Sequence, residues 1–379
     1  MKKIQFISSY GKLHEYNFIR VVLPNTPIDV YSDTGYFNYA NSEVETYYQK
    51  NNIKVFTANS FNKIKPRFLR VVFNLFSAIK TIIKSQNKKY DYCFVHYLST
   101  RRAILSLFVP KRTKIILIGY GSDVLRRKSL KDFFFKKMLK RSHLIILNSM
   151  NMVSRFRDFY GHDYVEKMKY IQFPCASFDR LNSYITTHSR DEALRRFGFP
   201  SNKKIVVCGH TATREEQFER IIDAIERAPK KQIEKYFFVF FMTYGSGDYV
   251  KYREEIRCKL SNSNFSSMIL EDYLDYDTMC LLHLVSDIHI TAIKTDALSL
   301  FMLEEMFAGA LVLYGSWLNY EEFEQDNYNA ISFADFNELT GLLSDNKKLV
   351  KTAPINKLRN KISLLNSNTE IHKKWTDIL

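Results

Sequence analysis

The amino-acid sequence predicts an α/β protein of two domains, each built on a parallel sheet, and three observations support this. Short apolar runs alternate with longer amphipathic segments, a pattern typical of parallel βαβ units. The alternation falls into two series, separated by a stretch at 173–204 that contains no apolar strand. The length of 379 residues exceeds that of most single domains, and 46% hydrophobic residues suffice for two cores.

Each element follows from the alternation. The first series predicts strands at 3–9, 29–33, 54–58, 90–96, 114–119 and 143–149. Amphipathic segments lie between them. The segment 67–84, with Arg67, Arg70, Lys80 and Lys84 on its narrow polar side, could face a membrane, but it is expected to pack on its sheet. The second series predicts strands at 204–209, 236–245, 267–270, 287–291 and 310–315, and helices at 215–228, 249–259, 277–285 and after residue 296.

These elements divide the chain into four parts. The boundaries expected are an N-terminal domain at 1–175, a linker at 176–203, a C-terminal domain at 204–353 and a helical tail at 354–379. Two such domains are expected to face each other across a cleft, because ligands bind at the carboxyl ends of parallel strands.

The charge indicates an anionic partner. Lys and Arg total 56 against 40 Asp and Glu, a net charge of +16. Nucleic acid is not expected, since the chain has no zinc-finger spacing, RNP signature or basic zipper. Five scattered cysteines without a CxxC pair, and no apolar run long enough for an export signal or a bilayer span, predict a cytoplasmic protein.

One basic segment suggests where the charge acts. RRKSLKDFFFKKMLKR, at 126–141, holds eight Lys or Arg residues, one Asp and several aromatic or aliphatic side chains. Basic residues mixed with aromatics on a helix suit an anionic membrane surface. We therefore expect peripheral association with the inner face of the plasma membrane through this segment.

The stretch KTDALSLFMLEEMFAGALVLYGS, at 294–316, carries the clearest site. Asp296 follows a predicted strand, and Glu304 lies eight residues later on the helix that begins there. The first N–H groups of a helix attract an anion, so the candidate anion-binding residues are Ala297, Leu298, Ser299 and Leu300. Glu304 is placed to accept hydrogen bonds from a ribose diol. A solvated helix edge is the simpler explanation for both acids.

Two loops add further candidates. In CGHTATREEQ, Gly209 and Thr211 follow a predicted strand, and Arg214 stands at the entrance to a helix, where a cation and backbone amides suit a diphosphate. Arg214 could instead pair with a neighbouring glutamate. Tyr244 and Gly245 end the strand at 236–245, where they form either a donor-binding loop or only a tight turn.

These motifs resemble a known family. TDALSLFMLEEMFAG resembles the E-x7-E segment of nucleotide-sugar glycosyltransferases with the GT-B fold, with Asp296 in place of the first Glu. The resemblance implies two Rossmann-like domains, a donor sugar facing Asp296 and a donor ribose on Glu304. Residues 203–325 are also similar to the Fuc4NAc transferases of enterobacterial common antigen synthesis, which act on a lipid-linked acceptor and whose pattern lacks the acid at Glu304.

The N-terminal domain would then bind the acceptor. His14, in the loop SSYGKLHEYN, and Asp123, in GYGSDV, are the candidate catalytic bases. Asp123 could instead cap the next helix. The sequence does not settle which residue is the base.

The sequence therefore predicts a glycosyltransferase that moves a sugar from a UDP-, dTDP- or GDP-sugar to a lipid-linked glycan of the bacterial surface. No cofactor and no metal are expected, because the acids of DYLDYD precede a helix and no strand-flanked DxD is present. The alternatives are a non-catalytic GT-B partner that binds glycan or stabilises an active transferase, and an epimerase or phosphorylase of the same fold.

Overall fold

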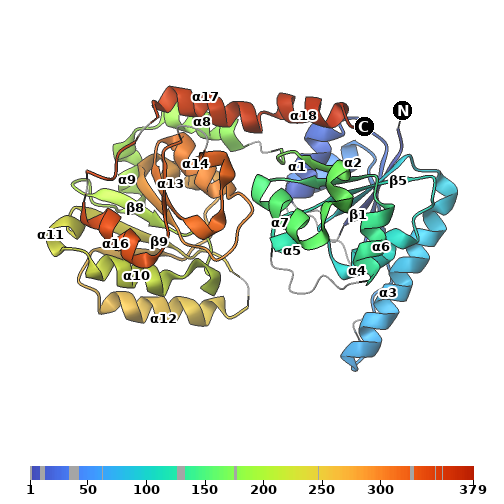
Figure 1. Ribbon diagram of the computed structural model, residues 1–379, viewed down its shortest axis with the longest axis horizontal. Helices are drawn as coiled ribbons and strands as arrows, with labels where there is room; N and C mark the ends of the chain where they lie inside the picture. Colours follow the sequence, from blue (N-terminus) through green and yellow to red (C-terminus); the bar gives the residue numbers. More distant parts are fainter. Residues whose placement is uncertain are drawn as a thin grey trace. The chain divides into compact units, whose positions relative to one another are not determined.

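The structure is a computed structural model that describes most of the chain. The described residues are 2–8, 13–33, 42–61, 63–125, 133–174, 177–245, 247–324, 328–345, 347–351 and 353–379. They form two compact units. Unit 1 comprises Met1–Cys175 with Asn366–Leu379, and unit 2 comprises Ala176–Leu365 (Figure 1).

Unit 1 is a parallel sheet covered by helices. Its strands are β1 (Ile4–Ser8), β2 (Ile28–Ser32), β3 (Lys54–Thr57), β4 (Tyr92–His96), β5 (Lys114–Ile118), β6 (Leu144–Leu147) and β7 (Met168–Tyr170). Their order in the sheet is β3-β2-β1-β4-β5-β6-β7, and all pairs are parallel. The chain therefore reverses direction across the sheet between β1 and β4.

The helices of unit 1 connect its strands as βαβ crossovers, except for the C-terminal helix α18. They are α1 (Leu13–Val22), α2 (Ser42–Lys50), α3 (Arg67–Lys84), η1 (Ser85–Lys88), α4 (Thr100–Leu107), α5 (Ser122–Leu125), α6 (Phe133–Arg141), α7 (Met150–Tyr160), η2 (His162–Lys167) and α18 (Asn368–Thr376). The C-terminal helix α18 buries Trp375 against Phe18 and Phe94, with ring centroids 4.8 and 6.0 Å apart. The end of the chain therefore completes the N-terminal core.

Unit 2 repeats this design. Its strands are β8 (Lys204–Cys208), β9 (Tyr236–Phe241), β10 (Ser267–Leu270), β11 (Ser286–Thr291), β12 (Leu311–Gly315) and β13 (Ala330–Phe333). Its helices are α8 (Ser177–Thr187), α9 (Arg190–Phe197), η3 (Arg214–Glu216), α10 (Phe218–Arg227), α11 (Lys230–Ile233), α12 (Tyr249–Ser261), α13 (Tyr276–Val285), α14 (Leu300–Ala308), η4 (Ser316–Leu318), α15 (Glu321–Glu324), α16 (Phe336–Ser344) and α17 (Ile355–Asn366).

The two faces of the unit 2 sheet carry separate cores because side chains alternate along each strand. Val206 and Cys208 of β8 pack with α10, α12 and α16, whereas Ile205 and Val207 pack with α9 and α13. Figure 1 shows these two groups of helices on opposite sides of the sheet. The strand order is β10-β9-β8-β11-β12-β13, so the reversal point lies between β8 and β11.

The expected linker at 176–203 is wrong. These residues form α8 and α9, which belong to unit 2 and pack against α13 and α14. Ser189 caps α9 by accepting a hydrogen bond from the N–H of Glu192, and Gly198 ends this helix with φ of 69°. The expected tail at 354–379 is indeed helical, but α17 belongs to unit 2 and α18 to unit 1.

Of two basic helices, one differs from expectation. Of the segment 126–141, residues 126–132 lie outside the described part, and the remainder forms α6, which buries Phe135, Met138 and Leu139 within unit 1. Phe133 and Phe134 of the same helix are 60% and 40% exposed, so the membrane contact expected of this segment stays a prediction. The helix α3, expected to pack on its sheet, buries only Ala78 and Ile82 among its 18 residues.

Candidate functional site

The candidate site lies at the reversal point of the unit 2 sheet. β8 and β11 are neighbours, but the crossovers from them run in opposite directions, so the loops that follow them separate and leave room for a ligand at their carboxyl ends. Residues 209–217 follow β8 and residues 292–299 follow β11. Of the thirteen residues expected at the site, eight lie here or on α14, and Tyr244 and Gly245 lie in a loop against it. Arg214, His14 and Asp123 are considered separately below.

The loop after β8 is held close to the sheet. Gly209 has φ of +65°, and a Cβ atom there would lie 2.5 and 2.6 Å from ring carbons of Phe218. Its N–H donates to the carbonyl of Ile290 on β11 at 2.9 Å. Glu216, fully buried, accepts from the Thr211 hydroxyl at 2.8 Å. Only glycine fits at position 209, and Glu216 fixes the path of the loop.

The loop after β9 packs against this first loop. The N–H of Ala212 donates to the carbonyl of Tyr244 at 2.6 Å. A Cβ on Gly245 would lie 2.8 Å from the carbonyl oxygen of Ala212, so glycine allows the two backbones to meet. The Tyr244 side chain is half exposed, and its pKa is raised to about 12 by desolvation and by nearby negative groups that include Glu216 and Glu304. Tyr244 therefore belongs to the same site as Glu304.

The loop after β11 leads into α14. Asp296 accepts from the N–H of Ala297 at 2.9 Å and from the Tyr320 hydroxyl at 3.0 Å. The helix begins at Leu300, later than expected, and Ser299 is its N-cap, accepting from the N–H of Met302 at 3.3 Å. Ala297, Leu298 and Ser299 therefore precede the helix. The first N–H groups of α14 have no partner within the helix, which favours an anion at this end.

Glu304 lies one turn into α14 and contacts α13. Its carboxylate is 3.3 Å from the Tyr276 hydroxyl, which donates to Oε1, and its Oε2 is 3.4 Å from Nε2 of His283. Tyr276 and His283 are seven residues apart and share one face of α13. Both contacts are long for hydrogen bonds to a charged group, so they position the carboxylate without binding it tightly.

The same imidazole joins Glu304 to Glu305. His283 Nδ1 lies 3.0 Å from Oε1 of Glu305, and both residues are fully buried. Burial lowers the pKa of His283, but the two carboxylates outweigh it and raise the pKa to about 9. Burial raises the pKa of Glu305. A cationic His283 between the two acids therefore orients Glu304 at neutral pH.

Three residues of this site carry no motif in the sequence. Two of them, Glu216 and His283, fix its geometry. His210 lies between Gly209 and Thr211, with its ring 6.0 Å from the Phe301 ring at the start of α14. Its Nδ1 is 3.2 Å from Glu216 Oε1, and 17% of its side chain is exposed. His210 is thus a polar group beside the N-terminus of α14, where the sequence analysis placed only backbone donors.

Arg214 does not stand where a diphosphate cation was expected. Its guanidinium contacts Asp248 at 3.0 Å, Glu255 at 2.7 Å and Glu219 at 3.8 Å, and stacks on Tyr252. The hydrogen bonds that Arg214 donates to Glu255 and Asp248 raise its pKa. Three carboxylates around one cation leave a local excess of negative charge, which disfavours a diphosphate. Arg214 joins η3 to α12 and α10 instead.

The two candidate bases lie in unit 1. The His14 side chain is outside the part of the chain that the structure describes, although its backbone belongs to α1. Asp123 is buried and accepts from the N–H groups of Leu98, Tyr120 and Gly121 at 2.6, 2.9 and 2.9 Å. Burial raises its pKa. Asp123 therefore braces the loops after β4 and β5, and its role as a base stays a prediction.

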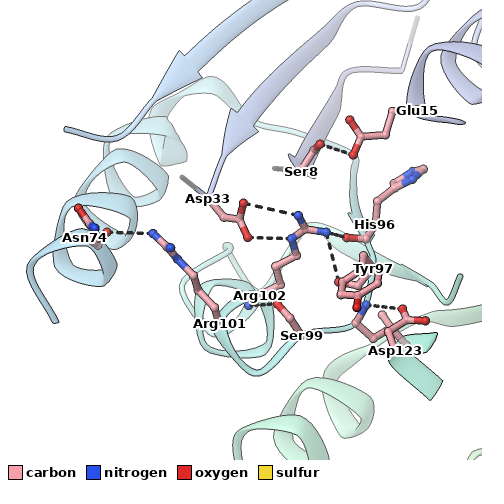
Figure 2. Close-up of polar contacts among 11 residues, drawn as sticks. Ser8, Glu15, Asp33, Asn74, His96, Tyr97, Ser99, Arg101, Arg102 and Asp123 are labelled. Atoms are coloured by element: carbon pink, nitrogen blue, oxygen red, sulfur yellow. Dashed lines mark hydrogen bonds and ion pairs between the residues drawn. The ribbon is translucent and has the colours of Figure 1, made fainter. Parts of the chain in front are cut away.

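A buried polar network occupies the strand ends of unit 1 (Figure 2). Arg102 donates to Asp33 at 2.9 Å and to the carbonyls of His96 and Tyr97, and His96 Nδ1 lies 2.5 Å from the Tyr120 hydroxyl. Ser8 donates to Glu15. Tyr97 has φ of +63°, which few residues other than glycine adopt. These groups fasten the ends of β1, β2, β4 and β5 to one another.

Within the described ranges, no three His, Cys, Asp or Glu side chains are arranged to hold a metal ion, and no helix is long and apolar enough to cross a membrane.

The two parallel sheets, each with a reversal point, have the architecture of the GT-B fold, and the expected fold class is confirmed by comparison with solved structures. HepE from Anabaena, in complex with UDP and glucose, matches with a TM-score of 0.72 at 15% identity over 100% of this chain and 99% of that one. A glycosyltransferase from Rickettsia africae matches with 0.72 at 14% identity, over 100% and 97%.

Sucrose-phosphate synthase from Thermosynechococcus elongatus matches with a TM-score of 0.73 at 12% identity, over 100% of this chain and 98% of that one. No protein-family model matches the sequence, and no curated protein matches it either. The chain therefore has the GT-B fold of glycosyltransferases along its whole length. At these identities the likeness establishes the fold and leaves the activity to the site.

Proposed function

We propose that this protein is a metal-independent GT-B hexosyltransferase that takes a sugar from a nucleotide donor and passes it to a lipid-linked glycan of the bacterial surface. The observation that carries the proposal is the position of the Glu304 carboxylate. A carboxylate oriented by Tyr276 and His283, one turn into the helix that follows the reversal point, suits a ribose diol.

The donor fits the site in a definite orientation. The ribose hydroxyls donate to Glu304, the diphosphate lies against the N-terminus of α14 beside His210, and the sugar extends toward Asp296. In the transfer, the acceptor oxygen bonds to the anomeric carbon and the bond from that carbon to the diphosphate breaks. The acceptor hydroxyl gives its proton to the base, for which His14 is the candidate. Helix N–H groups stabilise the charge on the departing diphosphate.

Two further observations support the donor and the acceptor. HepE, a protein of the same fold, binds UDP and UDP-glucose. The resemblance of residues 203–325 to Fuc4NAc transferases supports a lipid-linked acceptor. The acceptor would bind in unit 1, where His14 remains the candidate base.

A thermal-shift screen across UDP, GDP, dTDP and CMP tests donor binding. A nucleotide present at 100 times its dissociation constant adds about 2.7 kcal/mol to the free energy of unfolding. We expect one nucleoside diphosphate to raise the melting temperature of the wild type and of the control Glu234→Gln, an exposed acid of unit 2. We expect the Glu304→Gln protein to show a smaller shift. If no nucleotide raises the melting temperature of the wild type, the donor site is not there.

One observation favours a non-catalytic GT-B partner. Two residues expected to act on ligands, Arg214 and Asp123, are committed to contacts within the protein. A protein that binds the donor but transfers no sugar from radiolabelled UDP-sugar to a membrane fraction would be such a partner. Release of free sugar or sugar phosphate would indicate hydrolysis or phosphorolysis instead.

A further inference from the structure

The helix α3 of unit 1 has an unusual exposed surface. Six of its apolar side chains are at least 40% exposed: Phe68 (72%), Leu69 (40%), Val71 (58%), Phe73 (45%), Phe76 (65%) and Ile83 (45%). They make up six of the sixteen large exposed apolar side chains in the described part of the chain. Such concentration on one helix of 18 residues marks an interaction surface.

The helix is amphipathic, but much of its apolar face is turned outward. Phe68, Val72, Phe76, Ile79 and Ile83 are spaced by four, four, three and four residues, so they line one stripe. The stripe covers 15 residue steps, about 22 Å at 1.5 Å per residue. Figure 1 shows part of α3 running past the edge of the unit 1 sheet, and Phe68, Phe76 and Ile83 of the stripe are exposed.

Contacts along one side attach α3 to unit 1. Asn74 accepts from the N–H of Phe61 at 2.9 Å, and Ser77 accepts from the N–H of Asn59 at 2.7 Å. Arg101 of α4 donates to the Asn74 carbonyl, as Figure 2 shows. Together with the buried Ala78 and Ile82, these contacts hold the helix in place, so the exposed apolar stripe does not arise from a loosely attached helix.

Charge identifies what covers the stripe. From Thr46 to Tyr90 the sequence has no Asp or Glu and ten cations: Lys50, Lys54, Lys63, Lys65, Arg67, Arg70, Lys80, Lys84, Lys88 and Lys89. Lys80 and Lys84 are exposed beside the stripe. Two copies packed through α3 would bring these cations together with no acid on the helix to neutralise them. An anionic bilayer would bury the apolar stripe among its lipid chains and attract the cations beside it to its headgroups.

We propose that α3 is the membrane-binding element of this protein and lies in the interface of an anionic bilayer, with Phe68 and Phe76 inserted and Lys80 and Lys84 at the headgroups. This assigns membrane contact to 67–84 in place of 126–141. The proposal does not depend on the identity of the donor or on catalysis.

Sedimentation with vesicles tests it on the full-length protein. We expect binding to vesicles of 70% phosphatidylcholine and 30% phosphatidylglycerol, and weak binding to phosphatidylcholine alone. Phe68→Gln with Phe76→Gln should lower the partition coefficient about 100-fold, since each buried phenylalanine is worth at least about tenfold. Lys80→Gln with Lys84→Gln should lower it about 20-fold.

Matched controls separate α3 from other surfaces. Val350→Gln with Leu364→Gln removes two apolar side chains of unit 2 that are 55% and 64% exposed, and should leave partitioning unchanged. Lys136→Gln with Lys137→Gln removes two cations of α6 and should lower partitioning less than the α3 charge variant. Far-UV circular dichroism and the urea denaturation midpoint of the α3 variants should equal those of the wild type, which shows that they are folded.

Several outcomes would overturn the proposal. They are absence of binding to acidic vesicles, equal binding by the Phe68→Gln/Phe76→Gln protein, or binding lost only in the α6 variant. A wild type that is a dimer in solution and becomes a monomer in the phenylalanine variant would show that a second copy covers the stripe. Quenching by brominated lipid of tryptophan fluorescence in Phe76→Trp, but not in Leu364→Trp, would establish insertion.

Discussion

The strand ends of the two sheets differ in how their acids are used. In unit 1 the carboxylates of Asp33 and Asp123 accept close hydrogen bonds from Arg102 and from three backbone N–H groups. In unit 2 the carboxylate of Glu304 has contacts of 3.3 and 3.4 Å, both from α13. The two sheets have the same topology but use these acids differently. In unit 1 the carboxylates hold the strand ends together through close hydrogen bonds, whereas in unit 2 the carboxylate of Glu304 is oriented by longer contacts. Only the second arrangement leaves bonding capacity for a ligand.

If the acids of unit 1 hold its strand ends together, breaking the ion pair between Arg102 and Asp33 should lower the free energy of unfolding more than any other change proposed here. The side chains of Arg102 and Asp33 are 3% and 7% exposed. Arg102→Met leaves Asp33 buried without its partner, so we expect the transition that includes unit 1 to lose about 3–5 kcal/mol in urea denaturation. Glu234→Gln removes an exposed pair and should cost less than about 1 kcal/mol. Similar small losses in both variants would contradict this role of the acids.

If His283 is a cation that orients Glu304, stability should depend on pH in a defined direction. The folded protein holds the proton more tightly than the unfolded chain, because the pKa is raised from 6.5 to about 9. Its contribution is complete below about pH 6.5 and is lost as the pH rises through 9, a change of about 3 kcal/mol at most. His283→Gln should abolish this slope, whereas His162→Gln, at an exposed position, should retain it. An unchanged slope in His283→Gln would mean that the imidazole is neutral.

A substitution in the loop after β8 should have a smaller effect on the free energy of unfolding. Gly209→Ala places a Cβ against the Phe218 ring at a φ of +65°, so we expect a loss of about 1–3 kcal/mol in the free energy of unfolding of unit 2. Gly341→Ala is the matched control, because nothing lies within 4 Å of that Cβ and the position is inside α16. It should stabilise by up to about 1 kcal/mol. Equal effects would show that the loop can relax around the ring.

Arg214 should have the least effect on the ligand. Its three carboxylate partners lie within unit 2, so Arg214→Ala should change the affinities for UDP and for uridine by less than about twofold each. Isothermal titration calorimetry measures both. A loss confined to UDP would restore the diphosphate role that the sequence suggested.

The fold was predictable because hydrophobic periodicity depends on local sequence. Strands such as 204–209 and 287–291 were found within about two residues, and the predicted fold class is confirmed. The short strands β7 and β13 have too few residues for a clear pattern. The helices α8 and α9 were missed because their Ser, Thr and Pro content resembles that of a connecting segment.

The site was less predictable because its contacts are distant in sequence. Asp296 and Glu304 could be located from one strand-to-helix motif. The partners of Arg214 come from 34 and 41 residues further along, and His283 precedes Glu304 by 21 residues without any motif. Periodicity also identified α3 as amphipathic but could not tell which face the fold turns outward. Charge and apolar spacing identify a helix with two faces, and packing alone decides which one is exposed.

The central claim is that Glu304 binds the donor ribose. Calorimetry of UDP and of its 2′,3′-dideoxy analogue with wild type and Glu304→Gln tests it directly, because glutamine keeps the volume but accepts through one oxygen only. We expect UDP to lose about 1.5–3 kcal/mol of binding free energy in the variant, while the analogue binds both proteins equally. If Glu304→Gln still discriminates against the analogue as strongly as the wild type does, Glu304 is not the ribose ligand and the proposed donor site is wrong.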